Sequence, residues 1–370
     1  MTKPEVLFVG TLNKDLPQYK SFAAKFNCLD YVLTTREQFQ ADLATKFSNI
    51  SAIYGAWLGF LPIGGFRTVL ESAAASPPKH LKIIAYCSVG YDHQDAEALA
   101  QHDIVMTNVP SDGAANPVAD LVVYYAILAF RQFHMYSKPI YNQIPHTIDL
   151  RHRLAQGKFD HDRGQSQMST SEGDGGSRYH FGETINGRAN CSPAGHTAAI
   201  IGFGKIGQLI GKKLDALGMD IVCIKRTPLT QQDHDHLGYR ATYAPHITQT
   251  GPVDLIVIAC PETPETHHLI NSHVIDAMAK PFRLVNIGRG SVVDEDALLQ
   301  GLKSGKVLFA GLDVFENEPA LNLELINRDD VVVTPHIGAS TVENFDYTAV
   351  KALKNIELVL DGKDAISRVN

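Results

Sequence analysis

Short apolar segments alternate with amphipathic stretches along most of this 370-residue chain. In its N-terminal part, β-like runs occupy residues 5–10, 31–33, 53–57 and 81–87, and helical stretches occupy 36–47 and 65–75. Each short buried strand of this kind needs a helix that covers the sheet and returns the chain to the next strand. The alternation therefore predicts an open parallel α/β domain.

The same alternation returns in the C-terminal half of the chain. The predicted strands are 197–201, 220–224, 254–260, 283–287, 307–312 and 331–333, and the predicted helices are 206–217, 271–280, 294–304 and 341–360. This pattern predicts a second parallel α/β domain. The last helix could cross back to the first domain.

Two segments lie between these regions. An apolar helix is predicted from Pro117 to Arg131, with proline at its start. It is apolar on nearly every face and must be buried, and a subunit interface is one way to bury it, so a homodimer is expected. Residues 160–188 are rich in glycine, serine, histidine and acids, and we interpret them as a mobile surface insertion. Histidines in this insertion lack the close spacing of a metal site, so no metal is expected.

The most informative segment is GFGKIG, which directly follows the predicted strand 197–201 and opens the predicted helix 206–217. Its residues are Gly202, Phe203, Gly204, Lys205, Ile206 and Gly207. The first glycine permits a tight turn, the second lets the backbone approach a pyrophosphate, and the third lets the helix pack close to the sheet. A purely structural turn is the alternative. Strand, turn, helix and strand follow in register, which favours a dinucleotide site at the helix N-terminus.

The end of the next predicted strand indicates which dinucleotide binds. An acid about twenty residues beyond the glycines would hold the ribose 2′-hydroxyl of NAD. This chain has Lys225, Arg226 and Thr227 there. Two cations and a hydroxyl suit a 2′-phosphate, so NADPH is expected rather than NADH. The alternative is a solvated basic loop with the choice of cofactor made elsewhere.

Composition limits the classes of partner. Apolar residues make up 44% of the chain and charged residues 20%, which is ordinary for a globular protein of two domains. A net charge of −7 argues against nucleic acid and anionic membranes as partners. The five cysteines are widely spaced and suggest no disulfide framework, so a cytoplasmic location is expected.

Three polar side chains follow predicted strands on the edge that carries the glycines. They are Arg289, Glu318 and His336. An arginine can hold the carboxylate and carbonyl of a 2-keto acid, and a histidine oriented by a carboxylate can deliver a proton to the carbonyl oxygen. Each also has a plain interpretation, as a loop cation, an exposed acid or a turn residue.

Several segments resemble the signature blocks of the D-isomer-specific 2-hydroxyacid dehydrogenase family. They are GFGKIG, PETPET, VNIGRGSVVDEDAL, GLDVFENEP and TPHIGAST, and the similarity extends over nearly the whole chain. The resemblance implies that Arg289 binds substrate, that Glu318 is the carboxylate partner and that His336 is the acid/base. Glu316 is the nearby competitor for the carboxylate role, but the family pattern places that residue immediately before the proline.

The resemblance also implies further contacts. The backbone amides of Val89 and Gly90 match the loop that cradles the substrate carboxylate, and Asp313 matches a residue near the nicotinamide amide. Strand ends are expected to add cofactor contacts from Cys260, Pro261, Thr266, Ile287 and Gly288. Trp57 is a candidate wall of the substrate pocket, with core packing as an equal alternative.

The fold that the resemblance implies is α/β, with two doubly wound parallel-sheet domains. A central Rossmann cofactor domain is expected over 117–336, and a flavodoxin-like substrate domain is expected from both termini, 1–116 and 337–370. Two departures from the family pattern stand out. Glu262 replaces the usual leucine, and the 160–188 segment looks inserted.

The predicted function is NADPH-dependent reduction of small 2-keto acids to D-2-hydroxy acids. Glyoxylate or hydroxypyruvate is the first choice of substrate and a branched-chain keto acid the second, because Lys225 to Thr227 resemble the glyoxylate/hydroxypyruvate reductase branch. The alternative is an NAD(P)-sensing, corepressor-like binding protein of the same fold. A formate-type dehydrogenase fits less well, since that branch resembles a Gln–His pair and this chain has Glu318.

Overall fold

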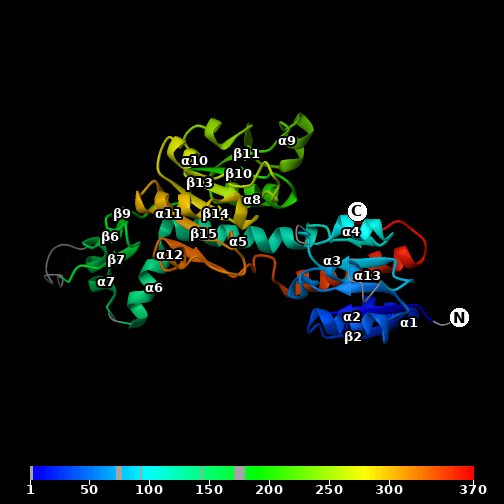
Figure 1. The fold of residues 1–370 in the computed structure, drawn as a ribbon. Helices are drawn as coiled ribbons and strands as arrows, with labels where there is room; N and C mark the ends of the chain where they lie inside the picture. Colours follow the sequence, from blue (N-terminus) through cyan, green and yellow to red (C-terminus); the bar gives the residue numbers. More distant parts are fainter. Residues whose placement is uncertain (1–2, 72–76, 92–93, 143, 145, 171–179) are drawn as a thin grey trace. The chain divides into compact units, whose positions relative to one another are not determined.

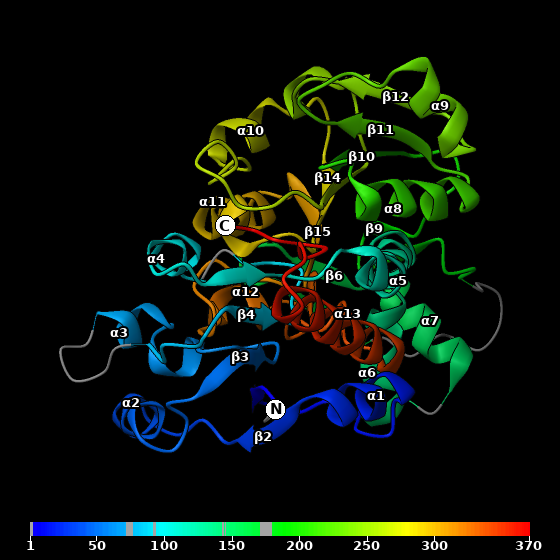
Figure 2. The same ribbon diagram turned by 90° about the vertical axis from the view of Figure 1, so that its right-hand side faces the viewer.

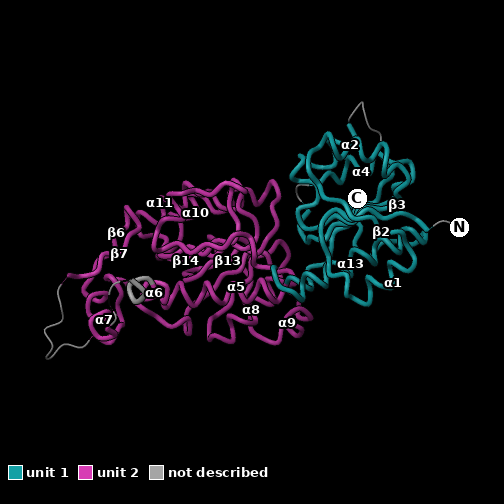
Figure 3. Tube along the Cα trace, turned by 90° about the horizontal axis from the view of Figure 1, so that it is seen from below, with its two compact units in different colours: residues 1–114, 340–370 teal, residues 115–339 magenta. Residues whose placement is uncertain are grey.

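The computed structural model describes residues 3–71, 77–91, 94–142, 144, 146–170 and 180–370. The chain divides into two compact units, one of residues 1–114 and 340–370 and the other of residues 115–339 (Figure 3). These boundaries lie within a few residues of those expected at 116 and 337. Each unit contains one large sheet with its own core.

The first unit is built on a five-stranded sheet in the order β2-β1-β3-β4-β5, with every neighbouring pair parallel. Its strands are β1 Glu5–Val9, β2 Asn27–Tyr31, β3 Ile50–Gly55, β4 Ile83–Tyr86 and β5 Val105–Thr107. Its helices are α1 Pro17–Lys25, α2 Arg36–Ala44, α3 Arg67–Leu70, α4 Ala96–Gln101 and α13 Val342–Leu360.

Helices cover both faces of this sheet. Leu7 and Val9 of β1 pack with residues of α2, α3 and α4, whereas Val6 and Phe8 pack with residues of α1 and α13. Successive side chains of a strand point to opposite faces, so a strand that is covered on both sides must be apolar throughout. The predicted helix 341–360 is α13, and it packs beside α1 on this sheet (Figure 2).

The second unit is built on a seven-stranded sheet in the order β12-β11-β10-β13-β14-β15-β16, again with every pair parallel. Its strands are β10 Thr197–Ile201, β11 Asp220–Ile224, β12 Ala241–Ala244, β13 Leu255–Ile258, β14 Phe282–Asn286, β15 Val307–Leu312 and β16 Val331–Val333. Its helices are α5 Asp112–Arg131, which begins just before the boundary, α6 Phe133–Asn142, α7 Thr147–Ala155, α8 Lys205–Ala216, α9 Gln231–Leu237, α10 Ser272–Ala277, α11 Glu295–Lys303 and α12 Leu323–Ile326.

The two faces of this sheet carry different helices. Helices α10, α11 and α12 pack on one face, and α5, α8 and α9 pack on the other (Figure 1). The strand order reverses direction at β10 and β13, next to the glycine-rich turn. Together the two all-parallel sheets confirm the predicted α/β class with two doubly wound domains.

Three edge strands of the two large sheets, β2, β5 and β12, were misplaced or missed. The run at 31–33 is not a strand, because β2 is Asn27–Tyr31 and Val32 is 81% exposed. β5 and β12 were not predicted. Edge strands have one unpaired side and are less completely buried, so their sequences lack the continuous apolar run that marks central strands.

Helix α5 begins at Asp112, so the prediction that Pro117 starts it was wrong. Pro117 lies inside the helix, where its missing N–H removes one intrahelical hydrogen bond. Among the described residues, α5 alone is long and apolar enough to cross a membrane, but 56% of that stretch is buried. Its apolar side chains pack on the seven-stranded sheet, as expected of a core helix.

The predicted insertion at 160–188 is described on both sides of residues 171–179, which lie outside the described residues. Its flanks contribute to two antiparallel hairpins, β6 Lys158–Asp160 with β7 Gln165–Gln167, and β8 Thr184–Ile185 with β9 Arg188–Ala189. Arg328 donates to the carbonyl of His161 over 2.8 Å, and the Ser166 N–H donates to Asp329 over 2.8 Å. The first hairpin is therefore tied to the segment before β16, and the mobility of the insertion stays a prediction.

Candidate active site

The candidate residues of the second unit all follow the carboxyl ends of strands in one parallel sheet. Because the strands are parallel, these ends form a single edge of the sheet. The segments concerned are 202–207 after β10, 225–227 after β11, 260–266 after β13, 287–290 after β14, 313–319 after β15 and 334–338 after β16. The structure thus brings the predicted cofactor and catalytic residues of this unit to one edge.

The glycines of the turn are required by close contacts. Gly202 has φ +91°, and a Cβ there would lie 2.5 Å from the amide nitrogen of Cys260. A Cβ at Gly207 would lie 2.1 Å from the carbonyl oxygen of Gly202. A Cβ at Gly204 would meet no atom within 4 Å, so protein packing does not demand glycine there. The free space beside Gly204 would let a pyrophosphate approach the backbone.

Of the three side chains between the glycines, those of Phe203 and Ile206 pack toward the protein interior, whereas that of Lys205 is exposed. Phe203 is buried and packs in the core with α5 and α8, and Ile206 packs against the same core. Only their backbones can therefore contact a cofactor. Helix α8 starts at Lys205, and its N-cap, Gly204, makes no side-chain capping bond. The first amides of α8 are thus suited to bind phosphate oxygens.

Alanine substitutions at Gly207 and Gly204 should have different effects, one on the stability of the fold and the other on cofactor binding. We expect Gly207→Ala to lower the free energy of unfolding by roughly 1–3 kcal/mol, because its Cβ collides with backbone. Gly204→Ala should cost less than about 1 kcal/mol, since alanine is only a poorer N-cap. It should nevertheless raise the dissociation constant for a reduced dinucleotide cofactor about tenfold by blocking the amides. Urea unfolding and fluorescence titration measure both quantities, and unchanged dinucleotide binding in Gly204→Ala would contradict this placement of the pyrophosphate.

The end of β11 presents cations to the same edge. Lys225 is half-buried, and Arg226 and Thr227 are exposed. The next acid along the chain, Asp233, accepts hydrogen bonds from the Thr230 N–H at 2.7 Å and the Thr230 hydroxyl at 2.8 Å. These bonds lower the pKa of Asp233 and engage it in capping α9. Asp233 therefore caps α9, whereas Lys225 and Arg226 directly follow β11.

The segment after β13 is a closed turn. The Thr266 hydroxyl donates to the carbonyl of Pro261 over 2.9 Å and accepts the Thr263 N–H at 2.7 Å, so this side chain shapes the turn. Cys260 is buried, and burial raises the pKa of its thiol to about 11. A Cβ at Gly288 would lie 2.6 Å from the carbonyl oxygen of Cys260. Residues 260 and 288 therefore pack backbone to backbone beside Ile287.

Arg289 lies at the end of β14 in an extended backbone conformation, with φ −142° and ψ 144°. The Asn286 amide donates to its carbonyl over 2.8 Å, and its own guanidinium donates to the carbonyl of Gly288 over 2.8 Å. These bonds hold the arginine against the turn that carries it. The side chain is half-buried, which strengthens its charged hydrogen bonds.

Glu318 and His336 form a hydrogen-bonded pair, with Glu318 Oε2 3.0 Å from His336 Nδ1. The second oxygen of Glu318 accepts the Phe315 N–H at 2.9 Å. Burial raises the pKa of Glu318, but the hydrogen bonds from His336 and Phe315 and the charges of His336 and Arg289 together lower it below its usual value. The carboxylate is therefore ionised beside the imidazole, and it favours the protonated imidazole.

The lowered pKa links this pair to acid stability. A folded-state pKa below the unfolded value of about 4.3 means that the ionised Glu318 stabilises the fold above that pH. This contribution is lost as the pH falls through the lowered folded-state pKa. The Glu318 side chain is 36% exposed to solvent, so the effect is modest.

Asp313 holds the segment that carries His336. Its buried carboxylate accepts the Thr334 hydroxyl at 2.6 Å, the Ile337 N–H at 2.9 Å and the Gly338 N–H at 2.9 Å. The Tyr125 hydroxyl of α5 lies 2.6 Å from the Thr334 hydroxyl and extends the network. Sequence reasoning placed Asp313 beside the nicotinamide and missed this function. The threonine in TPH was the one local signal for it.

His336 has φ +54°, a left-handed conformation that is uncommon outside glycine. The Asp313 bonds to the next two amides explain how this conformation is maintained. Strain of this kind persists where surrounding contacts determine it, and it concentrates at functional sites.

The expected substrate residues of the first unit share an edge of its own sheet. Trp57 follows β3, and Val89 and Gly90 follow β4, which is the neighbouring strand. The Asn108 amide donates to the carbonyl of Val89 over 2.8 Å and fixes that turn. Trp57 is 55% exposed, so it is not a core residue in this unit.

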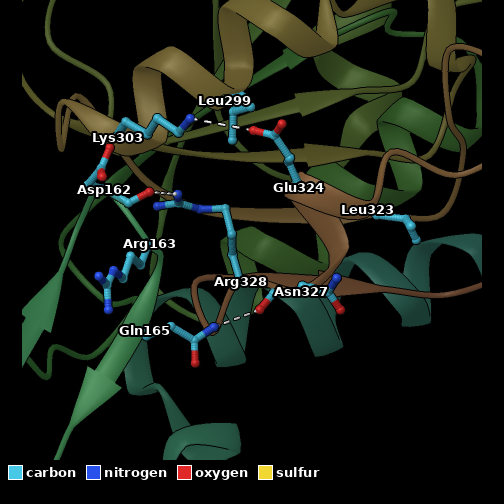
Figure 4. Close-up of a pocket in the computed structure, with 9 residues that line it drawn as sticks. All are labelled: Asp162, Arg163, Gln165, Leu299, Lys303, Leu323, Glu324, Asn327 and Arg328. Carbon is cyan, nitrogen blue, oxygen red and sulfur yellow. Dashed lines mark hydrogen bonds and ion pairs between the residues drawn. The ribbon is translucent and has the colours of Figure 1, made fainter.

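A separate pocket of about 390 Å³ lies elsewhere in the second unit (Figure 4). It is lined by residues of the insertion, α11 and α12, including Arg163, Lys303 and Arg328. α11 and α12 end just before β15 and β16 begin, so the pocket adjoins the amino ends of the strands. It is therefore at the edge opposite the catalytic residues and takes no part in the site described above.

No cluster of three metal-ligating side chains occurs among the described residues. All five cysteines are free thiols.

Comparison with known proteins agrees with this architecture. Residues 170–338 match the NAD-binding domain of the D-isomer specific 2-hydroxyacid dehydrogenases. A Saccharomyces cerevisiae protein assigned as a 2-hydroxyacid dehydrogenase is 30% identical over 386 residues, which cover 98% of this chain and 95% of the relative. The chain belongs to the D-isomer-specific 2-hydroxyacid dehydrogenase family. The resemblance inferred from the signature blocks is confirmed.

Other members of the family extend the comparison. The glyoxylate reductase of Pyrococcus horikoshii is 32% identical over 290 residues, covering 78% of this chain and 75% of the relative. The crystal structure of D-mandelate dehydrogenase from Rhodotorula graminis in its holo form superposes with a TM-score of 0.82 at 27% identity, covering 100% of this chain and 98% of that one. This protein is therefore an oxidoreductase of the 2-hydroxyacid dehydrogenase class with an NAD(P)-binding domain.

Proposed function

We propose that this dehydrogenase is an NADPH-dependent reductase that converts small 2-keto acids to D-2-hydroxy acids. Glyoxylate or hydroxypyruvate is the first choice of substrate, and a branched-chain keto acid is the second. The observation that carries the proposal is the Glu318–His336 pair beside Arg289 on the edge that holds the glycine-rich turn. The similarity to the P. horikoshii glyoxylate reductase supports the class of substrate.

Each residue of this set has a distinct chemical role in the proposal. Reduced nicotinamide, when bound, supplies the hydride for the keto carbon. Arg289 holds the carboxylate and carbonyl oxygens through paired charged hydrogen bonds. His336 faces Glu318 with Nδ1, so Nε2 delivers the proton to the carbonyl oxygen. Glu318 orients the imidazole and stabilises its protonated form.

A substrate panel tests the proposal. Oxidation of NADPH would be followed with glyoxylate, hydroxypyruvate, 4-methyl-2-oxopentanoate and phenylglyoxylate, the last because the R. graminis neighbour is a D-mandelate dehydrogenase. We expect the highest kcat/KM with glyoxylate or hydroxypyruvate. No turnover with any of the four would refute the proposed function, and a preference for phenylglyoxylate would replace small keto acids with aromatic ones.

The cations after β11 give a prediction for cofactor choice. Arg226→Ala should raise the KM for NADPH by about 10–100-fold, because a charged, paired contact to the 2′-phosphate is lost. The KM for NADH should change less than about threefold, since NADH lacks that phosphate. Steady-state kinetics with both cofactors measures the difference.

Arg240→Ala is the matched control for this substitution. Arg240 is also exposed, but it directly precedes β12 and so lies at the amino edge of the sheet. It should leave both KM values unchanged. An enzyme that prefers NADH before and after Arg226→Ala would show that the cofactor part of the proposal is wrong.

We also propose that the protein acts in the cytoplasm as a homodimer. Five free thiols suit a reducing compartment. Tyr124 of α5 is 49% exposed and Phe133 at the start of α6 is 44% exposed, so aromatic surface is available near the apolar helix. Light scattering on the purified protein distinguishes a dimer from a monomer.

A further inference from the structure

A second histidine–glutamate pair lies in the segment that carries Glu318. His268 Nε2 is 2.6 Å from Glu316 Oε1, and Glu316 stands two residues before Glu318. The side chains of this second pair are 35% and 23% exposed. The segment after β15 therefore contacts two histidines through two different glutamates.

Glu316 is also bound to the start of α11. Its N–H donates to Glu295 Oε1 over 2.9 Å, and its Oε2 accepts the Glu295 N–H at 3.2 Å. The exchange is reciprocal, so both the backbone and the carboxylate of Glu316 are held. Glu295 is buried, and its burial and the nearby carboxylate of Glu316 raise its pKa.

These contacts join three strand-end segments. His268 belongs to the segment after β13, Glu295 follows the Arg289 turn after β14, and Glu316 follows β15. The His268 N–H donates to the carbonyl of Ser291 over 2.8 Å. A Cβ at Gly290, the residue after Arg289, would lie 1.9 Å from the carbonyl carbon of Phe315, so the second and third segments also touch directly.

Displacement of Glu316 must affect Glu318. The turn from Phe315 to Glu318 is closed by the bond between the Phe315 N–H and Glu318 Oε1, and Glu316 lies inside it. Whatever fixes Glu316 therefore fixes the position from which Glu318 reaches His336. His268 has φ +47°, the same strained region as His336, which indicates that tertiary contacts determine its position.

We propose that His268, Glu316 and Glu295 form a positioning clamp that holds Glu318 in contact with His336. The clamp rests on the proposed catalytic roles of Glu318 and His336. His268 Nε2 contacts the carboxylate of Glu316 where it meets Glu295. The titratable groups next to His268 are His267, whose ring stacks on it with the centroids 4.1 Å apart, and Glu316 from the β15 segment, which Glu295 of α11 contacts in turn.

Substitutions at His268 and Glu316 test the clamp in the full-length protein. His268→Leu removes the hydrogen-bonding group, His268→Gln keeps a hydrogen-bond donor, and Glu316→Gln keeps the size of the side chain. We expect His268→Leu to lower kcat about tenfold with KM for the keto acid changed less than about threefold, because the catalytic pair is displaced. His268→Gln should restore most of kcat.

The pH profile separates positioning from simple stabilisation. When Glu318 moves away, the imidazole of His336 loses its carboxylate partner, so the pH profile of kcat/KM should differ from that of the wild type. The NMR resonance of the Nδ1 proton of His336, which reports its hydrogen bond to Glu318, should change in the same variants. The NMR readout does not require turnover. Absence of keto-acid reduction in the wild type would thus refute the proposed function, while the Nδ1 proton resonance would still decide the clamp.

Lys280→Gln is the control for stability. Lys280 pairs with Asp254 over 2.7 Å at a similar depth, but at the amino end of β13. It should lower Tm without changing the pH profile. The clamp is refuted if His268→Leu and Glu316→Gln lose stability as Lys280→Gln does but keep the wild-type kcat, pH profile and Nδ1 proton resonance of His336. If His268→Leu does not fold, Glu316→Gln alone shows whether the clamp positions Glu318 or only stabilises the fold.

Discussion

His336→Asn is expected to lower kcat for keto-acid reduction by about 10²–10⁴-fold, because the imidazole that delivers the proton is removed. Asparagine tolerates the left-handed conformation of this position, φ +54°, so the fold should be retained. The residual rate of the variant should also lack the pH dependence that proton delivery by an imidazole gives the wild-type rate. Single-turnover and steady-state rates across the pH range measure both effects.

The control for this substitution is His273→Asn. His273 is an exposed residue of α10 and belongs to none of the strand-end segments that carry the candidate site residues. It should leave kcat and its pH dependence unchanged. A His336→Asn enzyme that keeps more than about a tenth of the wild-type kcat would show that another group delivers the proton.

Arg289→Lys is expected to lower kcat/KM for the keto acid by about 10²-fold or more. Lysine keeps the charge but cannot offer two parallel donors to a carboxylate and a carbonyl oxygen. The guanidinium also bonds the carbonyl of Gly288 over 2.8 Å, and a lysine amine would not reproduce that orientation. NADPH binding should be nearly unchanged, so fluorescence titration separates loss of substrate binding from loss of the cofactor site.

Arg240→Lys serves as the matched exchange, because it makes the same chemical change at an exposed position on the opposite edge of the sheet. We expect wild-type kinetics from it. If Arg289→Lys retains kcat/KM within about threefold, the substrate is not held by a paired guanidinium contact, and the role assigned to Arg289 is wrong.

The central strands could be read from the sequence because parallel strands that are covered on both faces are apolar throughout. β10, β11 and β15 have the predicted bounds. Of the four strands at the edges of the two large sheets, β16 was also predicted with its bounds, whereas β2, β5 and β12 were misplaced or missed. Their partial exposure gives them mixed sequences, and only pairing with a neighbour defines them.

The candidate site likewise contains features that the sequence predicts and features that it does not. The glycine-rich turn could be predicted because its requirements lie within one segment. Gly202 has a positive φ, and a Cβ at Gly207 would collide with the carbonyl oxygen of Gly202. The Asp313 network and the His268–Glu316 pair could not be predicted. Their partners are supplied by segments distant in sequence, so no spacing rule links Tyr125 to Thr334 or His268 to Glu316.

By itself, the sequence determined that a dinucleotide turn follows a buried strand and that an arginine, a histidine and two neighbouring glutamates lie near strand ends. It did not determine which glutamate serves which histidine, except through a family resemblance. Tertiary structure decided this, placing Glu318 at 3.0 Å from His336 and Glu316 at 2.6 Å from His268. The physical reason is that hydrogen-bond partners depend on where separate strand ends meet in space, which the order of residues within one segment does not specify.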